Sequence, residues 1–76
     1  MYNEIKNILI FKTDIATAEA RHCAGKILDA HMLIHHWNVD LDDEDCVLRI
    51  VSAELTPQDV ISTINNCGFF CEELAG

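Results

Sequence analysis

Positive charge is scarce in this sequence. Five Lys and Arg residues stand against 13 Asp and Glu residues, which gives a formal net charge of -8 at pH 7. Proteins bind the phosphate backbone of nucleic acids through clustered Lys and Arg side chains, and this chain has no basic patch of that kind. We therefore expect no nucleic-acid partner, because the acidic surplus attracts cations or a basic protein surface instead.

Long hydrophobic runs are also missing. The longest early run, at 8–11, falls far short of the roughly 20 apolar residues that cross a bilayer, and it is too short for a signal-peptide core. We therefore expect a cytoplasmic protein without a membrane partner. In that reducing compartment the four cysteines should remain free thiols, with no disulfide. They are Cys23, Cys46, Cys67 and Cys71.

Glycine is too sparse for the motifs that most enzymes use. Gly25, Gly68 and Gly76 form no phosphate-binding loop, and no nucleophile-elbow motif is present. The Cys and His residues have no ordering partner at a recognisable spacing, as a nucleophilic site requires. We expect no catalytic residue, no cofactor-binding residue and no cofactor, and hence no enzyme.

Hydrophobic residues, in contrast, are plentiful. They make up 50% of the 76 residues, while charged residues make up 24%, a balance typical of a globular protein. The length suffices for one modest core. No repeat, linker or low-complexity segment interrupts the chain, so residues 1–76 are expected to form a single domain.

The pattern of residue types predicts four strands, at residues 4–13, 34–41, 46–53 and 69–74. Both faces of the first strand are apolar, with Ile8 and Ile10 on one side and Leu9 and Phe11 on the other, so this strand should lie centrally or be covered on both sides. The second and third strands should form a hairpin, and the fourth should lie at a sheet edge. The core-facing positions of the hairpin are expected to be Trp37, Val39, Leu41, Leu48 and Ile50, with Val47, Arg49 and Val51 on the opposite face.

Two helices are predicted between these strands. The first runs from about Ala16 to Ala30, with Asp14 or Thr17 as its N-cap, and Gly25 inside it suggests close packing against a neighbour. The second starts at Thr56 as N-cap, with Pro57 at the first helical position. Gly68 is suited to the left-handed residue that ends it.

The order strand, helix, strand, strand, helix, strand predicts an α+β fold of the ferredoxin-like βαββαβ type. In this fold two helices cover one face of a four-stranded antiparallel sheet. An acylphosphatase-like hydrolase shares it, but such an enzyme needs an arginine-bearing anion loop after the first strand. The only arginines, Arg21 and Arg49, lie elsewhere.

Three stretches resemble the heavy-metal-associated domain of copper chaperones and metal-transporting ATPases. Residues 11–17 (FKTDIAT) resemble the family's first strand and the apolar residue before its first cysteine. Residues 38–41 (NVDL) resemble its second strand. Residues 59–69 (DVISTINNCGF) resemble its second helix and the Gly-aromatic ending. Their order and spacing match the family over nearly the whole chain.

The resemblance implies the fold without the family's metal site. Counting back from Ala24, Ile27 and Leu28, which match the first-helix core, places the two metal-binding cysteines of the Cys-x-x-Cys motif at Thr17 and Ala20. Paired thiolates at the start of a helix hold one soft cation, whereas a hydroxyl and a methyl group do not. We therefore expect this chain to share the family's fold but not its copper transfer.

Histidines leave an alternative open, in which relocated ligands bind Cu or Zn. His22 and Cys23 lie near the lost site, although neighbours on a helix point about 100° apart. His35 and His36 should face opposite sides of a strand, while His31 and His35 can still meet across the loop. Our primary prediction is that no residue is a metal ligand. The candidates under the alternative are His22, Cys23, His31, His35 and His36.

Two further clusters favour structural roles. Cys67 and Cys71 are four residues apart, but Gly68 places them in different elements, so a structural Cys67 is favoured over a ligand or redox pair. The carboxylates at 40–45 lack the Gly and the final bidentate Glu of a calcium loop. They are better explained as a solvated hairpin turn.

These features together predict a non-catalytic domain of heavy-metal-associated type that works through protein contact. Val47, Val51 and one apolar row of the first strand would be exposed on the outer sheet face. A contiguous apolar patch usually marks an interface. The expected partner is another protein or a second copy of the chain, forming a homodimer through the open sheet face.

Overall fold

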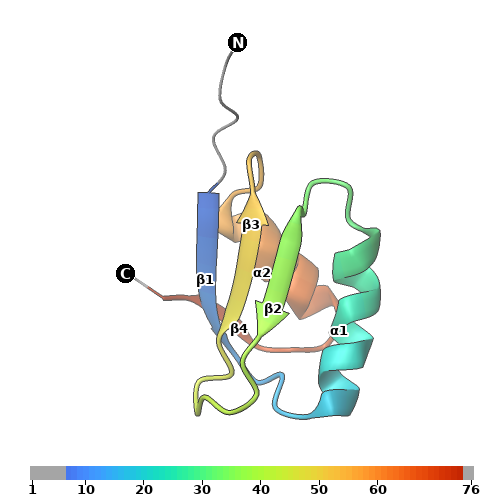
Figure 1. Cartoon of the computed structure of the whole chain (residues 1–76), viewed down its shortest axis with the longest axis vertical. Helices are drawn as coiled ribbons and strands as arrows, with labels where there is room; N and C mark the ends of the chain where they lie inside the picture. The colour runs from blue at the N-terminus through green and yellow to red at the C-terminus, as the bar shows by residue number, and fades with distance from the viewer. Residues whose placement is uncertain (1–6, 75–76) are drawn as a thin grey trace.

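The computed structural model describes residues 7–74, and its element order confirms the predicted ferredoxin-like fold (Figure 1). Two helices lie against one face of a four-stranded antiparallel sheet. No helix in the described chain is long and apolar enough to cross a membrane. The elements are β1 (Asn7–Thr13), α1 (Ala18–Ala30), β2 (His36–Val39), β3 (Leu48–Ser52), α2 (Pro57–Asn66) and β4 (Cys71–Glu73).

The sheet has the strand order β2-β3-β1-β4, so β1 is central and β4 is an edge strand, as predicted. In the β1–β3 pair Ile8 lies opposite Val51, and Phe11 lies opposite Leu48. Because side chains alternate along a strand, this register sends Phe11 and Leu48 to the helix side and Ile8 and Val51 to the outer face. The predicted part of the first strand at residues 4–6 lies outside the described residues.

The core lies between the sheet and the two helices. Phe11 and Ile15 from the first strand and its following loop are fully buried, as are core residues of both helices. The hairpin positions predicted to face the core do so, with Trp37 and Leu41 at its margin. The buried cluster comprises Phe11, Ile15, Ala24, Leu28, Val39, Leu48, Ile50, Leu55, Val60, Ile64 and Cys71.

Gly25 lies where α1 crosses β2, as its place inside a predicted helix suggested. A Cβ atom built on Gly25 would lie 3.0 Å from Cζ2 of Trp37. The indole is held in this position, because its Nε1–H donates to Oδ1 of Asp29 at 2.7 Å. The absence of a side chain at Gly25 therefore allows the ring to lie directly against the helix.

Both helices begin at the predicted caps. Thr17 caps α1, which starts at Ala18 rather than at Ala16 because the cap itself has extended backbone angles. Thr56 and Asp59 form a reciprocal capping box at the start of α2. Hydrogen bonds from the backbone N–H and the side chain of Thr56 to the Asp59 carboxylate hold the pKa of that carboxyl below its ordinary value.

Three of the strands are shorter than predicted, because residues at their ends belong to turns or to the end of a helix instead. After α2, Gly68 has φ +93°, and its N–H and that of Phe69 donate to Asn65 and Ile64. This Schellman-type ending delays β4 until Cys71. The N–H of Ile34 closes a turn onto His31, so β2 starts at His36.

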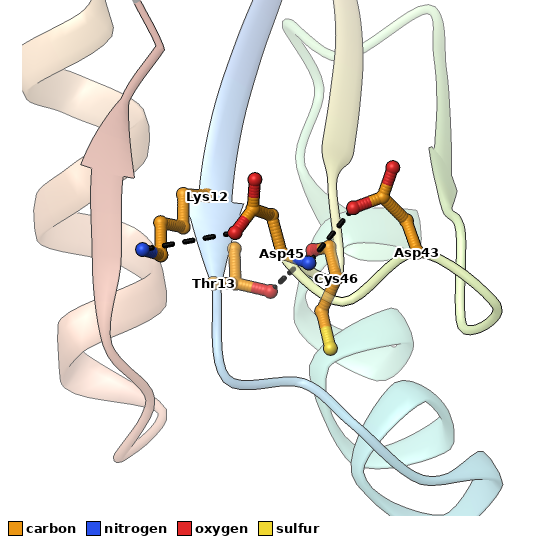
Figure 2. Close-up of polar contacts among 5 residues, drawn as sticks. All are labelled: Lys12, Thr13, Asp43, Asp45 and Cys46. Carbon is orange, nitrogen blue, oxygen red and sulfur yellow. Dashed lines mark hydrogen bonds and ion pairs between the residues drawn. The ribbon is translucent and has the colours of Figure 1, made fainter.

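The loop between β2 and β3 is fastened to the end of β1 (Figure 2). Cys46 adopts a left-handed φ of 45°, and its carbonyl accepts a hydrogen bond from buried Thr13 Oγ1 at 2.7 Å. Lys12 forms an ion pair with Asp45 at 3.7 Å. Because of these contacts β3 begins only at Leu48. They also fix the position of the end of β1, where the β1–α1 loop begins.

Candidate functional site

The β1–α1 loop occupies the place where the resemblance expects a metal site. Ile15 is fully buried and anchors the loop in the core, while its N–H donates to Thr13 Oγ1 at 3.1 Å. The carboxylate of Asp14 accepts from the N–H of Phe70 at 2.8 Å, which ties the loop to the segment before β4. Asp14 is therefore a cross-link between two loops and not the cap of α1.

Thr17 and Ala20 lie at the first turn of α1, at the two positions that the resemblance assigns to the family's metal-binding cysteines. The Thr17 hydroxyl accepts a hydrogen bond from the N–H of Ala20 at 3.0 Å. A neutral hydroxyl that caps a helix and a methyl group give a soft cation no ligand. The sequence also holds no two cysteines three residues apart.

His22 and Cys23 diverge, as expected for neighbours on a helix. His22 lines a groove on the β2 side of α1 together with Gly25 and Trp37. Cys23 lines a different groove, on the α2 side, with His31 and Cys67. The two candidate ligands therefore do not converge on one ion.

The loop histidines also divide between two surfaces. His35 and His36 line a groove with Arg21 and Asp29. His31 borders the groove between the helices, and its Nδ1 accepts the N–H of Leu33 at 3.2 Å. Between residues 7 and 74, no three His, Cys, Asp or Glu side chains come together as a metal site would require.

The acidic residues before β3 build the turn, in agreement with the sequence interpretation. The carboxylate of Asp40 accepts the N–H of Asp42 at 3.0 Å, and that of Asp43 accepts the N–H of Asp45 at 2.8 Å. Figure 2 shows the second of these bonds beside the Lys12–Asp45 ion pair. Short side chains that bond the backbone two residues ahead are typical of such turns.

The cysteines occupy distinct environments, and all four are free thiols in the structure. Cys71 is 7% exposed, and burial raises its pKa from 9.0 to about 11. Cys67 caps the end of α2, half-buried, and its pKa is raised by burial and by the nearby Cys23. As predicted, Cys67 and Cys71 lie in different elements.

The outer face of the sheet carries an uncovered apolar row on its two central strands. Ile8 is 61% exposed, and its register partner Val51 is half-buried. Ile10 follows on the same face of β1 and lies opposite Arg49. Both helices lie on the other side of the sheet, so they do not cover this row (Figure 1).

Comparison with solved structures finds the same architecture in copper-handling domains. The apo heavy-metal-associated domain of a copper chaperone for superoxide dismutase superposes with a TM-score of 0.80 at 17% identity, covering 99% of this chain and 74% of that one. The Cu(I)-loaded first domain of the human copper chaperone for superoxide dismutase gives 0.77 at 17%, over 91% and 93%. The fold is that of a heavy-metal-associated domain.

A yeast copper transporter domain, solved in apo and Cu(I)-loaded states, shares the heavy-metal-associated fold at a TM-score of 0.76 and 17% identity, over 90% and 94% of the two chains. No family model matches the sequence. No curated protein matches it either. The likeness therefore establishes the heavy-metal-associated fold and leaves the activity to be inferred from this chain's own residues.

One pairing escaped the sequence analysis. Cys23 and Cys67 line the same groove between α1 and α2, although 44 positions separate them in the chain. Spacing along the chain relates each cysteine only to its neighbours in sequence, so it does not indicate this pair. Antiparallel helices on one sheet face bring the middle of the first helix beside the end of the second, and this consequence of the predicted fold would have revealed the pair.

Proposed function

We propose that this chain is a non-catalytic domain of heavy-metal-associated type that has lost the Cys-x-x-Cys metal site and works through protein contact. The contact surface is the outer face of the sheet, and its occupant is a second copy of the chain. The exposure of Ile8, 61% on a central strand, carries the proposal. A cytoplasmic setting agrees with the four free thiols.

The chemistry of the β1–α1 loop supports the first part of the proposal. A transfer domain needs ligands that bind a soft cation and then release it, and thiolates at a helix N-terminus provide them. In this chain Thr17 and Ala20 use the corresponding positions to cap α1. Residues in those roles stabilise a helix and bind no ion.

The composition of the outer face supports the second part. Its apolar centre consists of Ile8, Ile10 and Val51. On the same side of the sheet, Lys12 of β1 lies opposite Glu72 of β4. An apolar centre with a polar rim is the usual anatomy of an interface. A two-fold arrangement lets this one patch contact its own copy.

Self-association should strengthen with added salt. Each copy carries a formal net charge of -8, so two copies repel one another at low ionic strength. Sedimentation velocity over a concentration series, at low and high salt, measures the dissociation constant. Dimer formation that tightens with salt is the expected result, whereas a chain that stays monomeric at high micromolar concentration in both buffers contradicts the proposal.

A charge placed on the patch provides the sharper comparison. Ile8→Lys introduces a buried, unpaired cation into the dimer and should weaken association about tenfold or more, since isolated charges are costly to desolvate. Met32→Lys is the matched control, because Met32 is 93% exposed and lies in the loop between α1 and β2, outside the strands of the sheet. Equal effects of the two variants would show that the sheet face is not the contact.

The alternative function is metal handling with relocated ligands. The superposed structures of copper chaperone and transporter domains in Cu(I)-loaded states favour testing it. Its ligands would come from His22, Cys23, His31, His35 and His36, and the metal would be Cu or Zn. Submicromolar binding to the reduced protein that is lost in His22→Ala would support this alternative.

A further inference from the structure

The groove between the two helices is lined by two cysteines. It has a volume of about 500 Å³ and is lined by residues of α1 and α2 and of their C-terminal ends. Cys23 borders it from α1 and Cys67 from the end of α2. Its remaining lining residues are Lys26, Ile27, His31, Thr63 and Asn66.

The antiparallel course of the helices explains why these cysteines line the same groove. His31, at the end of α1, is close enough to Asp59, in the first turn of α2, for its charge to contribute to the lowered pKa of that carboxyl. Moving eight residues back along α1 and eight residues forward along α2 leads from this pair to Cys23 and Cys67. Cys23 and Cys67 therefore lie at a similar level along the groove.

We propose that Cys23 and Cys67 form a two-coordinate site for a soft monovalent cation of the Cu(I) or Ag(I) class, bridging α1 and α2. Cys23 and Cys67 both line one accessible groove. An ion held between two sulfurs spans a wider gap than a direct sulfur–sulfur bond of about 2 Å. Thiolate sulfur is the ligand that soft cations select. The site is separate from the β1–α1 loop and from the outer face of the sheet.

Charge supports a cation at this position. Two thiolates that line one groove repel each other unless a cation lies between them. A bound monovalent cation removes that repulsion and releases the thiol protons. Each cysteine therefore becomes an anionic ligand, with two protons lost for each ion bound.

The number of ligands selects the class of metal. His31 lies eight residues from Cys23 along α1, about 12 Å at the rise of an α-helix, too far to join the same ion. In the described part of the chain no group of three potential ligands exists. Zn(II) prefers four ligands and is disfavoured, whereas a soft monovalent cation is satisfied by two thiolates.

Titration of the fully reduced protein with Cu(I), buffered by a competing chelator, tests the site. One ion for each chain is expected, with the ultraviolet absorption of a thiolate–metal bond. Cys23→Ser and Cys67→Ser should each lower the affinity about 100-fold or more, because each leaves a single tethered ligand. Cys46→Ser is the matched control and should bind as the parent chain does, since Cys46 is buried in the loop before β3.

Alkylation of the parent chain gives a second measurement that needs no variant. Bound Ag(I) should protect both Cys23 and Cys67 from iodoacetamide, as read by peptide mass spectrometry. Absence of protection at either residue, unchanged binding in either Ser variant, or Zn(II) binding as tight as Cu(I) binding would overturn the assignment. Self-association through the sheet face is measured separately, so failure of one proposal does not decide the other.

Discussion

The thiol of Cys71 illustrates how one buried side chain links pH to stability. It packs in the core at the start of β4, and burial raises its pKa from 9.0 to about 11. A thiol whose pKa is higher in the folded state than in the unfolded chain contributes its full stabilisation at pH values below the unfolded-state pKa. The contribution is then lost as pH rises toward the folded value, because the unfolded chain ionises first.

We therefore predict an alkaline loss of stability that depends on Cys71. Between pH 9 and pH 11 the free energy of unfolding should fall by about 2 kcal/mol from this group, since the slope reaches at most about 1.36 kcal/mol per pH unit. Urea unfolding at both pH values measures it. The loss should be smaller in Cys71→Val than in the parent chain. An equal alkaline loss in Cys71→Val would contradict the assignment.

The contact between Gly25 and Trp37 predicts that alanine at position 25 destabilises the protein, opposite to its usual effect in a helix. Alanine normally stabilises a helix relative to glycine by about 1 kcal/mol. Here its Cβ would lie 3.0 Å from an indole ring that Asp29 holds in place, so Gly25→Ala should destabilise the protein. In a Trp37→Leu background the same change should stabilise it. Thermal unfolding of the four proteins gives the coupling, and two equal effects would refute it.

The start of α1 offers a test of how this chain aligns with the heavy-metal-associated fold. Thr17 is its N-cap and Ala20 lies three residues later, so cysteines at both positions would face one ion at the positive end of a helix. Thr17→Cys with Ala20→Cys should create a Cu(I) site. The experiment uses a background of Cys23→Ser and Cys67→Ser, which removes the groove between the helices as a competing site.

A shifted pair provides the control for this gain of binding. Ala16→Cys with Glu19→Cys keeps the same spacing but moves both sulfurs back by one residue, so it should bind Cu(I) less tightly. Loss of the Thr17 cap should also cost about 1 kcal/mol of stability in the first variant. A folded Thr17→Cys, Ala20→Cys protein that binds no better than the shifted pair would show that the alignment is misplaced.

Elements whose signals are local were the most predictable from sequence. The caps at Thr17 and Thr56, the left-handed Gly68 and the alternation along β3 each depend on a few neighbouring residues, and each is confirmed. The strand ends were predicted too long, because a Schellman ending and two turns use backbone groups that a strand would need. Periodicity alone does not reveal such competition.

Contacts between distant parts of the chain were harder to predict. Its place before the first helix predicts Asp14 as a cap, whereas its carboxylate accepts a hydrogen bond from the N–H of Phe70, 56 positions away. Cys23 and Cys67 were likewise assessed apart. Both contacts follow from the packing of the finished fold, in which the β1–α1 loop meets the end of α2 and the helices run antiparallel.

The molecule as a whole presents two faces with different chemistry. The helical side holds the groove with two thiols, while the opposite side of the sheet is a surface with an apolar centre at Ile8, Ile10 and Val51. Because β1 and β3 are the inner strands, this centre is flanked on both sides by further strands. Association through it leaves the groove between the helices open.

The most direct measurement of that contact is a dilution series followed by amide chemical shifts of the isotopically labelled protein. We predict that concentration-dependent shifts gather on residues of β1 and β3, including Ile8 and Val51, and leave the middle of α1 unchanged. The same series for Ile8→Lys should show them only at higher concentration. Shifts that gather on the helices, or their absence up to millimolar concentration, would contradict protein contact through the outer face of the sheet.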